Sequence, residues 1–260
     1  MSLFKAQKGR GTNFPWLSED ERFQFPHPDY ANSEGILCCG GNLSPGMLLS
    51  AYSQGVFPWY NSDELIFWWS PDPRFVLMPG ELHVSASMKK IIKKRLFMLS
   101  MDSAFDQVIE YCSKVYRPGQ HGTWITRDML LAYKELHRLG YAHSVEAWQD
   151  GQLAGGFYGI AIGSAFFGES MFSLKPDASK AAFIPFAWFL EEKGFTLIDS
   201  QVHTQHMETM GAKNISRRSY LELLDKAVKK QGFTGSWAKL FPDFPASKGL
   251  ASLSHGKAGL

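Results

Sequence analysis

Residues 142–172, AHSVEAWQDGQLAGGFYGIAIGSAFFGESMF, predict the centre of the fold. Three runs in this stretch, 142–149, 152–162 and 164–172, are rich in aromatic, β-branched and small apolar residues, which is typical of buried strands. Asp150-Gly151 separates the first two runs and is one of the pairs most typical of a two-residue hairpin turn. We therefore expect an antiparallel meander of three strands.

The flanking sequence predicts helices and further strands around this meander. Before it we expect strands at 74–78 and 97–101, a short helix at 85–95, and two helices that begin after Asp102 or Ser103 and after Thr126. After it, apolar residues at helical spacing predict a helix that Pro185 must kink or open, and a buried strand follows at 195–202. The order predicts an α+β domain over residues 74–245, with a central, mostly antiparallel sheet flanked by helices. GCN5-related acyltransferases share this order of elements.

The first part of the chain has a different character. Prolines in Phe14-Pro15-Trp16, Phe25-Pro26-His27-Pro28 and Ser70-Pro71-Asp72-Pro73 prevent long regular helices. One helix is predicted from Ser44 to the stop at Gly55. We expect a small N-terminal domain over residues 1–73, and a loose tail over the small and polar residues 246–260.

The composition limits the class of protein. The chain has 260 residues, of which 45% are hydrophobic and 20% charged, so it can bury a sizeable core and is not predominantly disordered. Its three cysteines include an adjacent pair and no Cys-x-x-Cys spacing, which argues against a disulfide framework and a zinc ribbon. No leader-like segment and no run of about 18 apolar residues occurs, so we expect a cytoplasmic protein that has no metal site and no membrane contact, and we expect a monomer.

Polar residues near two predicted strand ends are candidates for chemistry. Alternation along 195–202 places Asp199 and Gln201 on one face, where a carboxylate beside an amide could orient an attacking amine and take its proton. Glu169, near the end of 164–172, could bind a substrate amine in a cleft. Structural alternatives stay open: Asp199 can cap the next loop or helix, and Glu169 can be an exposed edge residue.

The net charge of +2 conceals a basic cluster. Lys89, Lys90, Lys93, Lys94 and Arg95 fall within seven positions, and no acidic residue occurs between residues 83 and 100. On a helix the lysines lie opposite an apolar side, and such a surface suits a phosphate backbone. The alternative is an ordinary solvated helix face, but the uncompensated run favours nucleic acid.

Aromatic residues are concentrated just before the predicted large domain. Six of them fall within the thirteen residues 57–69: Phe57, Trp59, Tyr60, Phe67, Trp68 and Trp69. Some can stack on a terminal base or line an apolar pocket, and the majority can form a core between the domains.

Several common active-site motifs are absent from the sequence. It contains no Gly-x-Ser-x-Gly, no Gly-x-Gly-x-x-Gly and no P-loop, which argues against a serine hydrolase and against a nucleotide cofactor. A coenzyme A-dependent acetyltransferase needs a glycine-containing pyrophosphate loop, but residues 173–179 contain no glycine. This acetyltransferase is the first alternative for the function of the chain, and a non-catalytic RNA-binding module is the second.

Seven ordered motifs, spread from about residue 35 to residue 220, resemble the bacterial leucyl/phenylalanyl-tRNA–protein transferases. They are Gly41-Asn42-Leu43-Ser44-Pro45, Gly55-Val56-Phe57-Pro58-Trp59-Tyr60, Trp68-Trp69-Ser70-Pro71-Asp72-Pro73-Arg74, Gly122-Thr123-Trp124-Ile125-Thr126-Arg127, His143-Ser144-Val145-Glu146-Ala147-Trp148, Gly168-Glu169-Ser170-Met171-Phe172-Ser173 and Leu197-Ile198-Asp199-Ser200-Gln201. The resemblance implies a small N-terminal domain joined to a GCN5-related acyltransferase-like domain. It also implies transfer of Leu or Phe, and more weakly Met, from Leu-tRNA or Phe-tRNA to the N-terminal Arg or Lys of acceptor proteins, which marks them for degradation in the N-degron pathway. No cofactor is implied, because the tRNA ester is already activated.

The resemblance also implies roles for individual residues. Asp199 and Gln201 match the pair that positions the acceptor amine and helps to deprotonate it, and the basic cluster matches a tRNA contact. The positions that match the aminoacyl pocket and the adenosine end of the tRNA are Trp59, Trp124, Phe157, Glu169, Phe186, Leu190 and Ile198. Phe157 stands where Met is common in the family and Leu190 where Phe is common, an exchange that roughly conserves the pocket volume.

Overall fold

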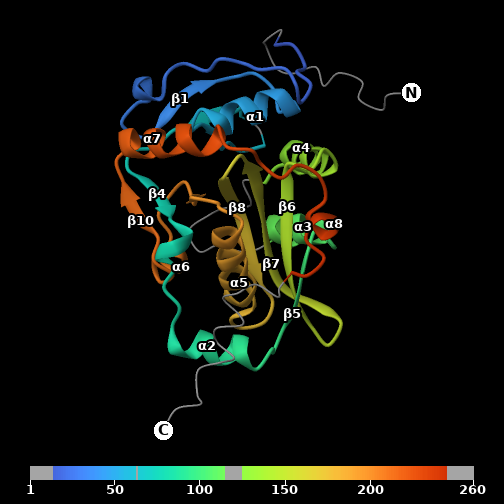
Figure 1. Cartoon of the computed structure of the whole chain (residues 1–260). Helices are drawn as coiled ribbons and strands as arrows, with labels where there is room; N and C mark the ends of the chain where they lie inside the picture. The colour runs from blue at the N-terminus through green and yellow to red at the C-terminus, as the bar shows by residue number, and fades with distance from the viewer. Residues whose placement is uncertain (1–13, 63, 115–124, 245–260) are drawn as a thin grey trace, which may run out of the picture.

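The computed structural model describes residues 14–62, 64–114 and 125–244. Within these residues a large sheet has seven strands (Figure 1). In spatial order they are β10 (Lys213–Ile215), β4 (Arg74–Leu77), β9 (Leu197–Asp199), β8 (Ala165–Ser173), β7 (Gln152–Ile162), β6 (Ala142–Gln149) and β5 (Met98–Met101). In the described sheet β8 and β9 are parallel, and the other neighbours are antiparallel.

The predicted meander is confirmed as β6, β7 and β8. Asp150 and Gly151 have φ angles of 53° and 73°, and Gln149 lies opposite Gln152. Both turn residues are therefore left-handed, as a hairpin turn that matches the twist of its strands requires.

Helices cover both faces of this sheet. On one face lie α2 (Ala86–Lys93), α5 (Ala178–Glu192), α6 (Gln205–Glu208) and α8 (Trp237–Leu240). On the other lie α1 (Pro45–Ser53), α3 (Phe105–Lys114), α4 (Arg127–Arg138) and α7 (Arg217–Val228). Neighbouring residues alternate between the two cores: Phe166 packs into the first and Phe167 into the second. The predicted mixed fold, with helices around a mostly antiparallel sheet, is confirmed.

One predicted strand is shorter than expected, and one strand of the sheet was not predicted. The strand expected over 195–202 ends at Asp199, because Gln201 adopts a left-handed φ of 60° and turns the chain away. The short polar strand β10 was not predicted, and it pairs with β4 at the edge of the sheet. Pro185 lies within α5, which continues through it.

The N-terminal region forms a second, three-stranded sheet in the order β1 (Ile36–Cys39), β3 (Phe67–Trp69) and β2 (Phe57–Pro58). Short 3-10 helices occur at Pro28–Tyr30 and Pro79–Glu81. The proposed domain boundary, 73–74, lies between β3 and β4. The proposed tail, 246–260, lies outside the described residues.

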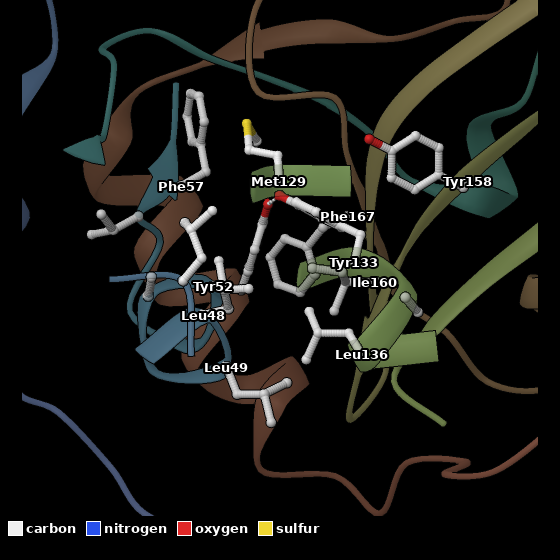
Figure 2. Packing of buried hydrophobic residues seen from close by; sticks show 14 of the residues in the cluster. Leu48, Leu49, Tyr52, Phe57, Met129, Tyr133, Leu136, Tyr158, Ile160 and Phe167 are labelled. Carbon is white, nitrogen blue, oxygen red and sulfur yellow. Dashed lines mark hydrogen bonds between the residues drawn. The ribbon is translucent and has the colours of Figure 1, made fainter. Parts of the chain in front are cut away.

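A single apolar core connects the small sheet and the large one. Figure 2 shows Leu48 and Tyr52 of α1 beside Tyr133 and Leu136 of α4, close to Phe167 of β8. The Tyr52 and Phe167 rings are 5.2 Å apart. This packing fixes the N-terminal region against the large sheet. No described helix has both the length and the apolar character needed to cross a membrane.

Candidate active site

A fork in the large sheet opens into a cavity. β8 and β9 pair only over 165–167 and 197–199. Beyond that point β8 continues to Ser173 alongside β7, while the chain after Asp199 turns away at Gln201. The carboxyl ends of two adjacent parallel strands therefore separate, and ligands of open α/β sheets commonly bind outside such strand ends.

The cavity in this fork has a volume of about 980 Å³. Much of its wall is apolar and comes from both sheets and from helices α5 and α6: Phe57, Phe157, Phe166, Phe183, Ile198 and Met207. Glu169 and Gln201 add polar groups on the two arms of the fork, and Trp59 contributes from the N-terminal region. The cavity can hold an apolar side chain next to groups that bind an amine or an ester.

Glu169 lies at a β-bulge. Tyr158 of β7 lies opposite Ser170, but the next residue, Gly159, lies opposite Gly168, so Glu169 is an extra residue in β8. A Cβ atom at Gly159 would lie 2.2 Å from the Phe167 carbonyl oxygen, so the backbones approach too closely here for any other residue. Bulges change the direction of a side chain beside an active site, and this one places Glu169 in the cavity lining.

Three side chains donate hydrogen bonds to the Glu169 carboxyl group. The Tyr52 hydroxyl and the Gln201 Nε2 donate to Oε1 at 2.7 and 2.9 Å. The Tyr133 hydroxyl donates to Oε2 at 2.9 Å, and the Tyr52 and Tyr133 hydroxyls also hydrogen-bond to each other. Helices α1 and α4 supply these tyrosines, so both the N-terminal region and the large domain hold Glu169 in place.

Burial raises the pKa of Glu169 from 4.5 to about 7. The hydrogen bonds from Tyr52, Tyr133 and Gln201 lower this pKa, and the nearby Asp199 charge raises it, but burial has the largest effect. A carboxyl group with a pKa close to neutrality can both accept and return a proton at physiological pH.

Asp199 has a different environment, because it is fully buried in an ion pair. Arg74 Nε and Nη2 donate to its two oxygens at 2.9 and 2.7 Å. The Tyr220 hydroxyl and the backbone N–H of Gln201 donate to the same carboxylate at 2.7 and 2.8 Å. Arg74 also donates to the Gly55 carbonyl oxygen at 3.2 Å, so this ion pair joins β4, β9 and α7 to the N-terminal region.

The predicted alternation of Asp199 and Gln201 does not extend past the end of β9. Gln201 lies outside the strand, and its side chain lines the cavity and reaches Glu169. Asp199 is not part of the described cavity lining, but its carboxylate accepts the backbone N–H of Gln201. The two residues are therefore connected through the backbone, and only Gln201 reaches the cavity.

The residues expected to form the aminoacyl pocket fall into two layers. Trp59, Phe157 and Ile198 line the cavity. Phe186 and Leu190 are fully buried outside the described lining; the Phe186 ring lies 5.2 Å from that of Phe157, in the layer behind the wall. Trp124, which was expected near the adenosine end, lies outside the described residues.

The basic cluster lies on and just after α2, at the opposite end of the molecule from α1 and β1 (Figure 1). All five of its cations are exposed, and none has an ion pair with a described residue. Met88 and Ile92 of α2 are buried in the same core as α5, so the apolar side faces inward as predicted.

The sequence and its relatives give the chemical context of this site. The family described as leucyl/phenylalanyl-tRNA protein transferase matches residues 76–225, and the N-terminal domain of that family matches residues 41–72. A leucyl/phenylalanyl-tRNA–protein transferase from Myxococcus xanthus (strain DK1622) is 49% identical over 86% of this chain and 95% of the relative. Another from Maridesulfovibrio salexigens is 47% identical over 82% of this chain and 89% of the relative.

The chain belongs to the leucyl/phenylalanyl-tRNA–protein transferase family. The family expected from the seven motifs is thereby confirmed, and so is the class of enzyme, a transferase. Among solved structures, L-PGS from Bacillus licheniformis matches 62% of this chain and 65% of its own chain, with 9% identity and a TM-score of 0.38.

Four polar residues around this candidate site were not predicted. They are Tyr52, Arg74, Tyr133 and Tyr220. Tyr52 and Tyr133 lie on two helices that the sequence predicts, but a helical pattern gives no partner for a hydroxyl group. Arg74 could have been found from its position at the start of an apolar strand, because a buried cation there needs a buried anion.

The raised pKa of Glu169 predicts a pH-dependent stability. The folded protein retains this proton up to about pH 7, whereas the unfolded chain releases it near 4.5. The folded state therefore binds more protons in this window, and the contribution of Glu169 to the free energy of unfolding falls as the pH rises through it. Urea unfolding measured between pH 4.5 and about 7 should show that the free energy of unfolding falls less steeply with rising pH in Glu169→Gln than in the wild type. Glu34→Gln, at an exposed position, is the control and should keep the wild-type slope. Equal slopes for wild type and Glu169→Gln would contradict the assignment.

Proposed function

We propose that this enzyme transfers Leu or Phe, and more weakly Met, from aminoacyl-tRNA to the N-terminal Arg or Lys of acceptor proteins. The observation that supports this most directly is the forked cavity, in which an apolar wall lies next to Glu169 and Gln201. An aminoacyl ester needs both surfaces, one for its side chain and one for the reacting groups. The new peptide bond would mark the acceptor for degradation in the N-degron pathway.

The apolar wall explains the proposed choice of amino acid. Phe157, Phe166 and Phe183 supply aromatic surface that can accept unbranched or γ-branched apolar side chains. A difference of one methylene group gives about 1–3 kcal/mol of discrimination, so Leu, Phe and Met should all be used to some degree. A charged side chain would be excluded, because the wall offers it no compensating partner for the loss of water.

The acceptor must place a cationic side chain next to its reacting amine. Glu169 and Asp177 are the carboxylates in the described lining of the cavity. Asp177 is exposed at the start of α5, and its side chain makes no capping hydrogen bond with that helix. A cationic Arg or Lys side chain near the fork would be attracted to these groups.

Asp199 acts in this proposal as a positioning residue. Its carboxylate is fully buried and accepts four hydrogen bonds, including the one that fixes the backbone of Gln201. Gln201 in turn orients the acceptor amine and Glu169. The role assigned to the pair is thus divided: Asp199 holds Gln201, and Gln201 contacts the substrates.

The tRNA has two proposed contacts. Trp59 lines the cavity and would stack on the terminal adenosine, together with Trp124. The basic cluster on α2 would bind phosphates of the tRNA body, because its five exposed cations have no described ion-pair partners. The reaction needs no cofactor, since the ester is already activated.

A transfer assay tests the proposal. Purified enzyme should move labelled Leu from Leu-tRNA to a peptide that begins with Arg, and the same peptide with an acetylated N-terminus is the control and should receive none. Transfer to the acetylated peptide, or acetylation from acetyl-coenzyme A without Leu transfer, would overturn the assignment.

The positioning role predicts that Asp199→Asn lowers kcat by roughly 10²-fold or more and leaves tRNA affinity nearly unchanged. The variant keeps the side-chain shape but leaves Arg74 without its charge partner. Circular dichroism should first show that the variant is folded. Tyr220→Phe is the matched comparison, since it removes one of four donors and retains the ion pair, and it should have a smaller effect. Unchanged turnover of folded Asp199→Asn would remove Asp199 from the mechanism.

The basic cluster predicts a change in salt dependence. Reversal of Lys89, Lys90 and Lys93 to Glu should weaken tRNA binding whichever amino acid is attached, and each lost phosphate contact should reduce the slope of log affinity against log salt by about 1. The control reverses three exposed lysines of and beside α7, Lys226, Lys229 and Lys230, and so changes the net charge equally. The same loss in both variants would show that the effect arises from total charge and not from the cluster.

A further inference from the structure

Glu169 in the cavity lining and two tyrosines behind it form a closed ring of hydrogen bonds. Tyr52 contacts Glu169 Oε1, Tyr133 contacts Glu169 Oε2, and the two tyrosine hydroxyls contact each other. We propose that this ring stores the proton that the acceptor amine releases during transfer and returns it to the leaving oxygen of the tRNA. The proposal rests on the proposed aminoacyl transfer and assigns its proton acceptor.

The protonation of Glu169 decides how many of the three contacts in the ring contain a hydrogen. With Glu169 ionised, the two hydroxyl protons serve three contacts, so if both point to the carboxylate, the contact between Tyr52 and Tyr133 has no hydrogen. With Glu169 protonated, three protons serve three contacts, and every residue in the ring donates once and accepts at least once. The ring can therefore close completely only around neutral Glu169; burial favours this neutral form, whereas the hydrogen bonds that the tyrosine hydroxyls donate favour the ionised form.

The fourth donor indicates which carboxyl oxygen carries the proton. Tyr52 and the Gln201 amide both donate to Oε1, which suits an oxygen that only accepts. In the protonated form Oε2 carries the proton and donates it to Tyr133, the reverse of the direction in the ionised form, and Tyr133 donates to Tyr52. One orientation of the ring thus satisfies all four hydrogen bonds at once.

The ring has a single opening to the substrate. Tyr52 and Tyr133 are fully buried and are not part of the described cavity lining, whereas Glu169 is part of it. A proton can therefore enter or leave through Glu169. The titratable and charged groups that act on the ring come from three elements: Tyr158 of β7, Asp199 of β9 and Arg74 of β4. Tyr220 of α7 contacts this Asp199–Arg74 pair. Asp199 is already paired with Arg74, and its charge disfavours ionisation of Glu169.

The chemical step balances with Glu169 as the only proton carrier. The neutral acceptor amine attacks the ester carbonyl carbon, so that a C–N bond forms and the C–O bond to the terminal ribose breaks. The amine nitrogen gives one proton to ionised Glu169, and the ribose oxygen takes that proton as it leaves. Glu169 ends ionised, as it began, and Tyr52 and Tyr133 hydrogen-bond to it in both forms.

Neither Asp199 nor Gln201 can replace Glu169 in this step. Asp199 is fully buried, and its oxygens already accept hydrogen bonds from Arg74, Tyr220 and the Gln201 backbone. The Gln201 side chain is a neutral amide with no basic site near physiological pH. Glu169 combines a position in the cavity lining with a pKa close to neutrality.

Tyr52→Phe and Tyr133→Phe test the ring, because each keeps the aromatic packing and removes one hydroxyl. Each change breaks the ring and takes one donor away from ionised Glu169. We expect kcat to fall about 10-fold or more, and the rise of kcat with pH, centred near 7 in the wild type, to move to higher pH. Tyr60→Phe is the matched control, since its hydroxyl bonds Thr126 at 3.2 Å and lies outside the ring. Wild-type kcat and an unshifted midpoint in both ring variants would overturn the proposal.

A second measurement does not depend on activity. Infrared difference spectra of wild type and Glu169→Gln isolate the C=O band of the neutral carboxyl group. This band should be present below pH 7, disappear as the pH rises through about 7, and persist to higher pH in both ring variants. A band missing below pH 7 would overturn the stored proton. If the band titrates as expected but no Leu is transferred, the proposed function fails while the protonated ring stands.

Discussion

The buried ion pair between Arg74 and Asp199 is the interaction on which the site depends. It lies where strands β4 and β9 meet, and Arg74 also binds the carbonyl oxygen of Gly55 in the N-terminal region. The guanidinium group lies between two aromatic rings, 4.8 Å from the centre of Phe57 and 4.4 Å from that of Tyr220. Loss of either partner would leave an unpaired charge in the core, at a cost of about 3–5 kcal/mol. The ion pair therefore fixes the N-terminal region, the large sheet and the chain segment that carries Gln201 to one another.

Gln201 and Glu169, on the two arms of the fork, are brought to the cavity by two different backbone irregularities. On one arm a left-handed residue, Gln201, ends the pairing of β9 and turns its amide toward Glu169. On the other arm a bulge in β8 places Glu169 against Tyr52 and Tyr133. The polar groups therefore meet at a single carboxyl group, while the apolar wall remains available for a substrate side chain.

The sequence predicts much of this fold, because its strands and helices have clear periodicity. The hairpin at Asp150-Gly151 follows from local turn chemistry, and the helix beginning after Thr126 follows from its capping residue. The end of β9 could not be predicted, since Gln201 is not a residue type that usually adopts a left-handed conformation. The partners of Glu169 and Asp199 were also beyond reach: Arg74 is 125 positions away from Asp199, and no local pattern records such a pairing.

The bulge at Glu169 has a consequence for the whole of β8. Phe167 and Phe172 are five positions apart, so strict alternation would place them on opposite faces, yet both pack in the core that contains α3 and α4. One extra residue thus divides β8 into two half-strands of opposite phase. Without Glu169 the two phenylalanines would be four positions apart, and regular alternation would still place both in this core. The packing of β8 therefore does not need the extra residue, whose effect is to bring a carboxyl group to the fork.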